Sequence, residues 1–398
     1  MQIKELKQNL YYVGVIDKEL RLFDVAIRTD YGTSYNSYLL RTREGVVVFE
    51  GSKEGFFDEY LSNIRSIIGD EPIKYLVVSH TEPDHSGAIR DLLNVYPDLT
   101  IIASASAHLN LSKILRKPYK RVDAKPETEM TIGEYTFRFI SGSFMHWPDV
   151  VFTYIKELKT LVSCDAFGCH YAPKGILLSE EKDREDYEKA FKYYYDHIMG
   201  PFPNQVIAAC RKVETLDIDL ICCGHGPVVD CDVKETINKY IGFAAPSIPS
   251  NDKNRVLIIY SSAYGYTRKI AKSLQIQLEK AEKTVICKEI DVLNYSNVKE
   301  DLIKEIRKAG TLLLGSPTIN NDAIVLYYDL LSSIPANIGV GKKASAFGDY
   351  GWSGEAVPNL LSRLKQLRFN VFDGVRINFE LDEKGAAEIK EFLDRVLA

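Results

Sequence analysis

From residue 255 onward, short apolar runs alternate with amphipathic stretches, and this alternation restricts the possible folds more than any other feature. The apolar runs are RVLIIYSS (255–262), TVICKEID (284–291), TLLLGSPT (311–318), KKASAFGDY (342–350) and VRINF (375–379). Helices are predicted between them, over 267–281, after 291, near 323–333 and from 355, and a last one follows 379. This fivefold alternation predicts a doubly wound parallel sheet with ligand loops at the carboxyl ends of its strands.

Residues 1–245 follow a different pattern. Hairpin-like text such as YNSYLLRTREGVVVFEG, in which residues 42–45 turn the chain, recurs in EYTFRFISGS and VVFTYIKELKTLVSCDA. Helical text such as FFDEYLSNIRSII and EEKDREDYEKAFKYYYDHIM is interleaved with it. The mixture predicts an α/β sandwich with mixed sheets rather than a series of βαβ units.

A segment rich in proline, serine and asparagine separates the two patterns. It reads FAAPSIPSNDKN over 243–254 and shows neither the helical nor the strand period. Such a composition is typical of an interdomain linker. We therefore expect one domain over 1–245, a linker over 246–254 and a second domain over 255–398.

Charge and composition exclude several classes of partner. The 50 Lys+Arg and 55 Asp+Glu leave a formal net charge of −5 without a basic tract, so nucleic acid and anionic membranes are poor partners. No apolar run approaches the roughly 18 residues that span a bilayer, and the first residues lack the apolar stretch of a signal peptide. Seven cysteines without a CxxC pair predict reduced thiols. The expected location is the cytoplasm.

Four side chains of metal-ligand type lie within the six residues from His80 to His85, directly after the apolar run IKYLVVS. In an extended segment, alternation sends His80, Glu82 and Asp84 toward one side, where one turn could present them to a pair of metals. A solvated acidic turn could carry the same residues, so further ligands are needed to decide.

Three further positions supply such ligands. His146 in SFMHWPD, Asp165 in LVSCDAFG and His225 in CCGHGP each lie beside an apolar β-like run. Four of the seven histidines of the chain thus occur in ligand-like contexts. We interpret His108 and His197 as ordinary core or surface residues. Together the positions indicate a dinuclear metal site.

The turn over 261–267, SSAYGYT, joins the first strand of the second domain to its first helix. Backbone N–H groups there, with the hydroxyls of Ser262 and Thr267, would cradle a monophosphate without a cationic side chain. Neither GxxxxGK(S/T) nor GxGxxG occurs in this turn, which disfavours ATP and NAD. Ordinary helix caps use the same residues, so the turn alone does not identify a ligand.

Two later loops at strand ends, over 316–321 and 348–354, strengthen the phosphate hypothesis. Their glycines allow close backbone approach, and Tyr350 and Trp352 offer flat surfaces for a flavin ring. The three loops together resemble a flavodoxin FMN site. The residues that we expect to contact FMN are Ser262, Ala263, Tyr264, Gly265, Tyr266, Thr267, Pro317, Thr318, Ile319, Asn320, Asp349, Tyr350, Gly351, Trp352, Ser353 and Gly354.

The HxExDH motif, followed by distant His, Asp and His, resembles the metallo-β-lactamase fold as it occurs in flavodiiron proteins, also called A-type flavoproteins. That family carries a flavodoxin domain after the lactamase-like one, so the resemblance covers essentially the whole chain. It implies an N-terminal metallo-β-lactamase-like αββα sandwich followed by a flavodoxin-like doubly wound parallel sheet. Zinc hydrolases of the superfamily usually carry HxHxDH, whereas the carboxylate of Glu82 favours iron over zinc.

The resemblance also implies the ligands of two non-haem irons. They would be His80, Glu82 and His146 for one iron, Asp84, His85 and His225 for the other, and Asp165 as the bridge. A mixed nitrogen and oxygen shell with open positions suits the reduction of a small diatomic molecule. One position departs from the family, because Asp349 stands where a small hydroxyl residue is expected. A carboxylate close to the flavin ring could lower its potential.

By the same resemblance, FMN would take electrons from an external donor and pass them to the diiron site, which reduces dioxygen to water or nitric oxide to nitrous oxide. The donor would be a rubredoxin-like protein or the reduced deazaflavin coenzyme F420. A head-to-tail homodimer, or a dimer of dimers, would bring the flavin of one subunit to the irons of the other. Tyr194, Tyr195 and His170 are our candidates for proton or hydrogen-bond donors near bound oxygen, with Tyr195 and His170 taken as the catalytic pair.

Two alternatives stay open at this point. A binuclear metal hydrolase with an appended flavodoxin domain would use its metals to activate water, and about two zinc ions per chain would identify it. A non-enzymatic electron carrier would be reoxidised slowly by oxygen and would release peroxide.

Overall fold

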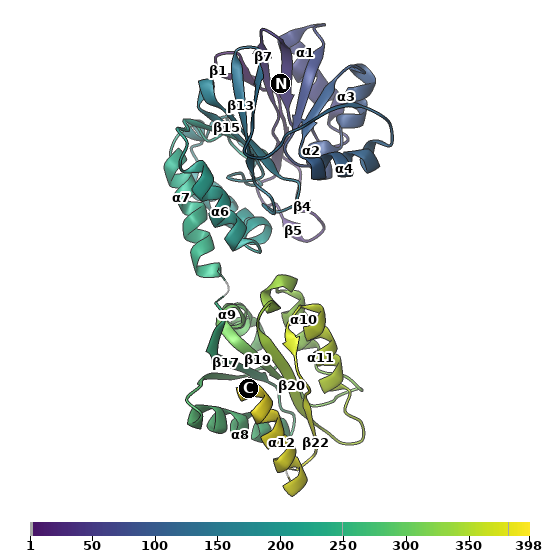
Figure 1. The fold of residues 1–398 in the computed structure, drawn as a ribbon, viewed down its shortest axis with the longest axis vertical. Helices are drawn as coiled ribbons and strands as arrows, with labels where there is room; N and C mark the ends of the chain where they lie inside the picture. Colours follow the sequence, from purple (N-terminus) through teal and green to yellow (C-terminus); the bar gives the residue numbers. More distant parts are fainter. Residues whose placement is uncertain (1–2, 249, 381) are drawn as a thin grey trace. The chain divides into compact units, whose positions relative to one another are not determined.

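The computed structural model describes residues 3–248, 250–380 and 382–398. The chain divides into two compact units, the first ending at Pro246 and the second beginning at Ser247 (Figure 1). The division lies at the start of the proposed linker, and the last three residues of that linker belong to the first strand of the second unit.

The first unit contains two large sheets. The seven-stranded sheet has the order β1-β2-β7-β8-β9-β10-β11 and the five-stranded sheet the order β12-β13-β14-β15-β16. The first comprises β1 (Lys4–Lys7), β2 (Leu10–Tyr12), β7 (Tyr38–Thr42), β8 (Gly45–Phe49), β9 (Ile73–Val78), β10 (Thr100–Ala103) and β11 (Lys120–Asp123). The second comprises β12 (Glu129–Ile132), β13 (Tyr135–Ser141), β14 (Val151–Ile155), β15 (Thr160–Cys164) and β16 (Leu220–Cys223).

Both sheets mix parallel and antiparallel pairs, as the sequence predicts. Strands β7 and β8 form an antiparallel hairpin in which Thr42 pairs with Gly45, whereas β8, β9, β10 and β11 run parallel. Two short hairpin-like pairs lie outside these sheets: β3 (Val15–Asp17) with β6 (Thr33–Tyr35), and β4 (Leu22–Phe23) with β5 (Ile27–Arg28).

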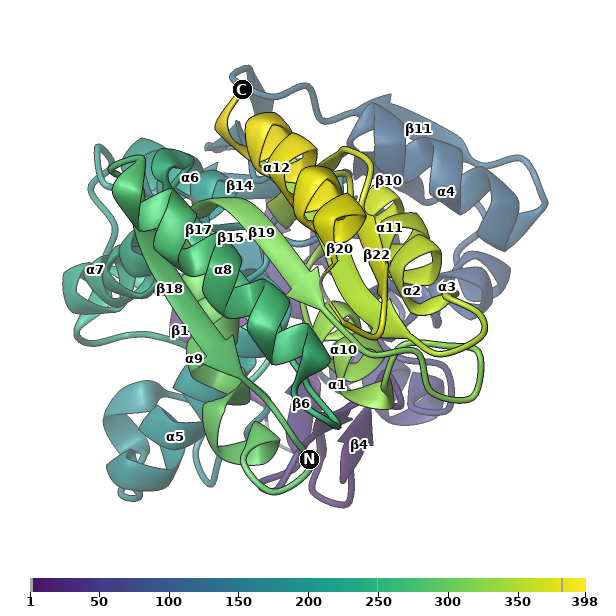
Figure 2. The ribbon, with the colours of Figure 1, turned by 90° about the horizontal axis from the view of Figure 1, so that it is seen from below.

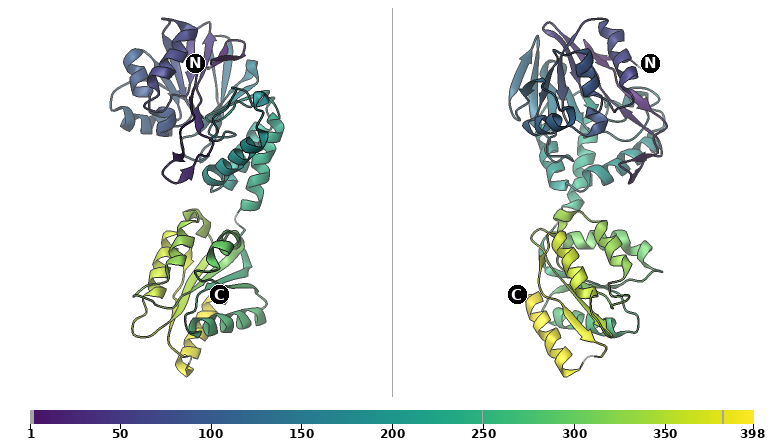
Figure 3. Two further views of the ribbon diagram at one scale, coloured as in Figure 1. Left: turned by 180° about the vertical axis from the view of Figure 1, so that it is seen from behind. Right: turned by 90° about the vertical axis from the view of Figure 1, so that its right-hand side faces the viewer.

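Helices cover the outer faces of both sheets, which confirms the αββα sandwich. Figure 1 shows α1, α3 and α4 on one side of the unit, and Figure 3 shows α6 and α7 side by side on the other. Residues four apart on α1, among them Tyr60 and Ile64, face the sheet and form the apolar stripe of an amphipathic helix. The helices are α1 (Phe57–Ile68), α2 (Pro83–Ser86), α3 (Ile89–Val95), α4 (Ala105–Leu115), α5 (Arg184–Tyr194), α6 (Pro203–Val213) and α7 (Val233–Ala244).

The second unit has a doubly wound parallel sheet of order β18-β17-β19-β20-β21, with β22 also paired to β20. This is the flavodoxin-like order, whose switch point lies between β17 and β19. The strands are β17 (Asp252–Tyr260), β18 (Thr284–Glu289), β19 (Ala309–Gly315), β20 (Lys343–Tyr350), β21 (Asn370–Val371) and β22 (Val375–Asn378). The predicted last strand, 375–379, corresponds to β22, and the short strand β21 precedes it outside any predicted run.

Helices cover both faces of this sheet. The residues of α8 and α12 pack on one face and those of α9, α10 and α11 on the other, and Figure 2 shows α8 and α12 on the side facing the viewer. These helices are α8 (Tyr266–Lys280), α9 (Tyr295–Lys308), α10 (Val325–Ser332), α11 (Ala356–Gln366) and α12 (Glu383–Leu397). Within the described ranges, no helix has the length and apolar character of a membrane span.

Candidate metal centre and flavin site

The side chains predicted to bind metal converge in the first unit. They are placed as follows: His80 and Glu82 after β9, Asp84 and His85 on α2, His146 before β14, Asp165 after β15, and His225 after β16. All of them are buried except His146, whose side chain is 12% exposed. Residues that are distant in sequence therefore share one pocket.

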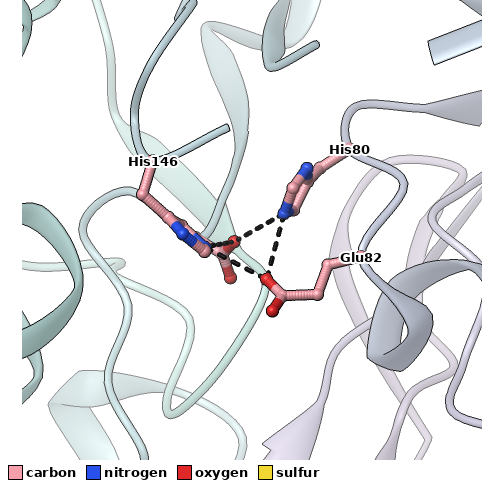
Figure 4. Close-up of side chains that lie close together, drawn as sticks. His80, Glu82 and His146 are labelled. Atoms are coloured by element: carbon pink, nitrogen blue, oxygen red, sulfur yellow. Dashed lines mark hydrogen bonds and ion pairs between the residues drawn. The ribbon is translucent and has the colours of Figure 1, made fainter. Parts of the chain in front are cut away.

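One group of ligand atoms surrounds Glu82 (Figure 4). The Oε2 atom of Glu82 lies 3.1 Å from Nε2 of His80 and 3.1 Å from Nε2 of His146. The Oδ2 atom of Asp165 lies 3.6 Å and 3.4 Å from the same two nitrogens. Two imidazoles and two carboxylates thus offer one ligand atom each to a common point.

A second group of ligand atoms lies on the other side of Asp165. Nε2 of His225 is 3.2 Å from Oδ2 of Asp84 and 3.2 Å from Oδ1 of Asp165. Nε2 of His85 is 3.0 Å from the same oxygen of Asp165 and 3.7 Å from Asp84. The two oxygens of Asp165 therefore face different groups, which is the arrangement that a carboxylate bridging two metals requires.

The hydrogen bonding of these carboxylates fits a pair of cations. Both oxygens of Asp84 and Oδ2 of Asp165 are buried without a hydrogen-bond partner among the described residues. Buried carboxylates are normally paired or coordinate metals, because an uncompensated charge is costly away from water. Imidazole nitrogen and carboxylate oxygen together are ligands that iron accepts.

The pKa values of the pocket residues also favour bound cations. Burial by itself would lower the pKa of His146, but the neighbouring carboxylates of Asp165 and Glu82 raise it to about 10. Burial likewise opposes protonation of His225, yet Asp165 and Asp84 raise its pKa to about 9. The pKa of Asp165 is held well below its usual range by the surrounding imidazoles, although burial would raise it. The carboxylates thus favour positive charge, which metal ions would supply in place of protons.

An irregularity in β15 aims Asp165 into the pocket. The register with β16 shifts between Val162 and Cys164, and Cys164 has a φ of 52°. A bulge of this kind redirects the next side chain, and left-handed backbone at a residue other than glycine is kept where the surrounding structure requires it.

Other residues hold the ligands in orientation. Nδ1 of His80 lies 3.2 Å from Oδ1 of Asp149, whose second oxygen accepts the backbone N–H of Thr81. Nδ1 of His225 lies 2.6 Å from the backbone carbonyl of Ser34. A hydrogen bond at Nδ1 fixes the ring and leaves Nε2 for a metal. Asp149 was not predicted, although it follows His146 by three residues in HWPD, and the Ser34 carbonyl could not be, because a backbone carbonyl leaves no signal in the sequence.

The side chain of His85 fits closely into the structure. A Cβ on Gly224 would lie 2.7 Å from its Cε1 atom, so glycine at this position makes room for the ring. Its Nδ1 atom faces Sγ of Cys164 at 3.8 Å, with the buried carboxylate of Glu50 nearby. Nε2 is thereby directed at Asp165 and the metal pocket.

The structure distinguishes the two tyrosines at the end of α5. The ring of Tyr194 lies 4.9 Å from that of His170, and burial together with the nearby charge of Asp165 raises the pKa of its hydroxyl. The ring of Tyr195 instead packs against Tyr240. Tyr195 is also the first residue of a π-helical turn, η3 (Tyr195–Met199). The geometry therefore favours Tyr194 over Tyr195 as a hydrogen-bond donor at the metal centre.

His170 borders the second ligand group without entering it. Its ring lies 4.9 Å from that of His225, and its Nδ1 atom lies 3.0 Å from Oγ1 of Thr33. Burial lowers its pKa to about 3, so the imidazole is neutral. It is placed to support His225 rather than to bind metal.

In the second unit, a cavity of 770 Å³ lies at the carboxyl ends of β17, β18 and β19. The expected flavin contacts that line it are Ser262, Ala263, Pro317, Ile319 and Asn320. The other expected contacts do not line it: Tyr264, Gly265, Tyr266, Thr267, Thr318 and residues 349–354. Tyr264 and Trp352 are 90% and 85% exposed, so these rings are available to a ligand or to another surface.

The turn at the start of α8 offers a donor set suited to a phosphate. The backbone N–H groups of Ala263 and Tyr264 donate to no other residue within the described ranges. Oγ of Ser262 accepts the N–H groups of Gly265 and Arg268 at 3.1 Å and 3.2 Å and shapes the turn. Free amides in the turn that precedes a helix, next to a cavity, fit the phosphate end of FMN.

Comparisons with known proteins agree with this architecture. Residues 33–226 match the family described as ODP family beta lactamase, and residues 258–392 match the flavodoxin family. The flavo-diiron protein FprA2 of Clostridium acetobutylicum is 37% identical over 372 residues, 92% of this chain and 92% of that protein. Type A flavoprotein fprA of Rhodobacter capsulatus is 32% identical over 390 residues, 96% of this chain and 87% of that protein.

Solved structures match the chain over both domains. Rubredoxin oxygen:oxidoreductase from Desulfovibrio gigas has a TM-score of 0.67 and 25% identity, covering 100% of this chain and 98% of that chain. The flavodiiron protein from Giardia intestinalis has a TM-score of 0.66 and 27% identity, covering 100% and 95%. The fold and the paired ligand groups define a two-domain protein with a lactamase-like dinuclear metal domain and a flavodoxin-like domain. The chain belongs to the flavodiiron protein family.

Proposed function

We propose that this chain is an FMN- and diiron-dependent oxidoreductase that reduces dioxygen to water, nitric oxide to nitrous oxide, or both. Its cofactors are FMN and two non-haem irons, and the side chains that surround Asp165 are proposed as the iron ligands. The observation that carries the proposal is that the two oxygens of Asp165 face separate groups of buried imidazoles and carboxylates.

The family supports this chemistry. Anaerobic nitric oxide reductase flavorubredoxin of Aeromonas hydrophila is 29% identical over 391 residues, 97% of this chain and 77% of that protein. Together with the rubredoxin oxygen:oxidoreductase, it indicates oxygen or nitric oxide as the substrate class and an external electron donor. We propose a rubredoxin-like protein or reduced coenzyme F420 as that donor.

The chain itself supplies ligands, charge balance and hydrogen bonds. When bound, two ferrous irons supply one electron each, and FMN relays further electrons from the donor. The carboxylates of Glu82, Asp84 and Asp165 would offset most of the positive charge of two ferrous irons, which lowers the cost of holding the metals in a buried pocket. Tyr194 is placed to donate a hydrogen bond toward the reacting molecule, since it lies beside His170 and near Asp165.

A cavity of 440 Å³ gives small molecules access to the proposed metal centre. It is lined by Glu82 and Asp84 on one side and by the β4–β5 hairpin, including Leu22 and Phe23, on the other. An apolar wall suits a small neutral substrate such as dioxygen or nitric oxide. Asp24 of the same hairpin has a raised pKa, because it is partly buried and close to Glu82.

We propose that electrons pass between subunits of a head-to-tail homodimer, or of a dimer of such dimers. Exposed apolar side chains near both sites support a contact: Val25 is 90% and Phe144 47% exposed near the metal centre, and Trp352 is 85% exposed in the flavin loop over 348–354. Apolar groups exposed together mark interaction surfaces.

Complementation tests this arrangement. Asp165→Ala removes the proposed iron bridge, and Ala263→Glu places a charge and bulk in the phosphate turn. If transfer occurs between subunits, co-expressed mixtures of the two inactive variants regain turnover, because some dimers join an intact flavin site to an intact metal centre. Mixtures that stay inactive despite dimer formation would exclude transfer between subunits.

Metal analysis and turnover test the function. We expect about two irons and one FMN per chain, and reduced protein that consumes oxygen or nitric oxide without releasing peroxide. Two zinc ions per chain without iron would instead indicate the hydrolase. Oxygen and nitric oxide should be compared side by side with each class of donor.

We also infer a cytoplasmic location, which the seven free thiols support.

A further inference from the structure

The carboxylate of Asp349 lies where the N-terminus of α8 would receive an anion. The Oδ1 atom of Asp349 accepts the backbone N–H of Thr267 at 3.0 Å, and the hydroxyl of Thr267 donates to the same oxygen. Thr267 is the second residue of α8 and is fully buried. A helix N-terminus attracts negative charge, and a carboxylate from another strand already satisfies one of its amides.

The backbone around Asp349 fixes this position. Gly348 lies so close to the carbonyl of Ser316 that a Cβ would clash with it, which holds the end of β20 against the loop after β19. The carbonyl of Asp349 also accepts the N–H of Thr318 at 3.0 Å. The side chain of Asp349 therefore faces the start of α8, at the phosphate end of the proposed flavin site.

Basic side chains nearby are already engaged. Arg268 pairs with Glu289, and Lys269 pairs with Glu380 at 2.8 Å. No ion pair to Asp349 occurs among the described residues. A phosphate dianion that approached this turn would therefore meet a carboxylate whose charge is not compensated by a neighbouring cation.

We propose that Asp349 determines the affinity and specificity of the flavin site by opposing the phosphate of FMN. Its carboxylate competes for the amide and hydroxyl of Thr267, and its charge repels the dianion. The site would then distinguish FMN from riboflavin less strongly than a site with a hydroxyl at this position. The inference rests on the proposed flavin site.

Two substitutions separate charge from shape. Asp349→Asn removes the charge and keeps an oxygen that can accept from Thr267, whereas Asp349→Ser also makes room and supplies a donor. In the full-length protein stripped of flavin, fluorescence titration measures the dissociation constants of FMN and riboflavin. We expect both variants to bind FMN about tenfold more tightly, with riboflavin affinity changed less than about threefold.

Asp382→Asn is the matched control. Asp382 also caps a helix of the second unit, accepting the N–H of Gly385 at 2.7 Å at the start of α12. Its substitution should leave the ratio of FMN to riboflavin affinity unchanged. If Asp349→Ser fails to fold, Asp349→Asn carries the test by itself.

The possible outcomes are distinct. FMN affinity that is unchanged or weaker in Asp349→Asn would overturn the inference, because the carboxylate would then not oppose the phosphate. Equal tightening of FMN and riboflavin would also overturn it, since the phosphate would not be the group that is sensed. Wild-type protein that binds neither flavin would instead refute the proposed flavin site.

Discussion

The two cofactor regions differ in how completely the chain itself forms them. At the metal centre, ligands from four separate segments converge and all but His146 are buried, and Asp149 and the Ser34 carbonyl hold two of the imidazoles in orientation. In the flavin region, Tyr264 and Trp352 are 90% and 85% exposed. The comparison indicates that the metal pocket is formed within one unit, whereas the flavin loops need a cofactor or another surface to cover their aromatic rings.

Their electrostatics differ as well. The metal pocket contains several carboxylates, whose negative charge favours bound cations. The same negative charge raises the pKa values of His146 and His225. The flavin region instead places the carboxylate of Asp349 on the donors that an anion would use. Substituting a carboxylate of the metal pocket should therefore abolish iron binding, whereas substituting Asp349 should strengthen FMN binding.

The largest expected effect comes from removing the bridge of the metal pocket. Asp165→Ala should abolish binding of both irons and lower kcat/KM about a thousandfold or more, because both ligand groups lose a shared carboxylate. FMN content should not change. Iron and flavin analyses of the same sample measure both. As a control, Asp196→Ala removes an exposed carboxylate paired with Lys192 and should alter neither. If Asp165→Ala keeps two irons per chain, Asp165 does not bridge them.

A smaller effect is expected from the residue that orients His80. Asp149→Asn should weaken iron binding about 10- to 100-fold, since it disturbs the partner of Nδ1 while leaving every ligand in place. Iron retention during graded chelation measures this effect. The matched control is Asp123→Asn, which alters an exposed carboxylate 3.7 Å from His108, outside the metal centre. Equal iron loss in both variants would argue against orientation by Asp149.

Much of the fold follows from the sequence because its patterns are local. Alternating runs define the sheet of the second unit, and the hairpin at residues 42–45 appears as predicted. The short strand β21 was not predicted, because Asn370 and Val371 form too short a run to recognise. Likewise, the continuous helical pattern near 184–199 gives no sign that α5 passes into a π-helical turn.

The candidate ligands could be named because dense ligand-type residues beside apolar strands are rare by chance. Their grouping followed only from the family resemblance, since the residue pattern by itself does not show which oxygen of Asp165 faces which imidazole. The choice between Tyr194 and Tyr195 also depends on helix geometry, because neighbouring residues face different sides of a helix. The contact between Asp349 and Thr267 joins residues 82 positions apart, which no local pattern reveals.

The two tyrosines provide a sharper comparison within the metal domain. Tyr194→Phe should lower turnover about tenfold with iron content unchanged, because it removes a hydroxyl beside His170 and near Asp165. Tyr195→Phe should stay within about twofold of wild type, because that ring packs against Tyr240 and Phe243. Steady-state rates with iron analysis measure both variants. A larger loss in Tyr195→Phe would restore Tyr195 as the donor.

The smallest effect is expected on the exposed side of the flavin region. Trp352→Ala should weaken FMN binding only about three- to tenfold, because a stacked ring contributes modestly and this one is 85% exposed. Riboflavin should weaken by the same factor, since an indole would stack on the flavin ring that both ligands share; this separates Trp352 from Asp349. Ile276→Ala is the control, because Ile276 is 52% exposed on α8 outside the flavin loops. If Trp352→Ala instead leaves flavin binding intact but dissociates the dimer, the ring serves the contact between subunits, and the flavin loops depend on a partner surface more than on the cofactor.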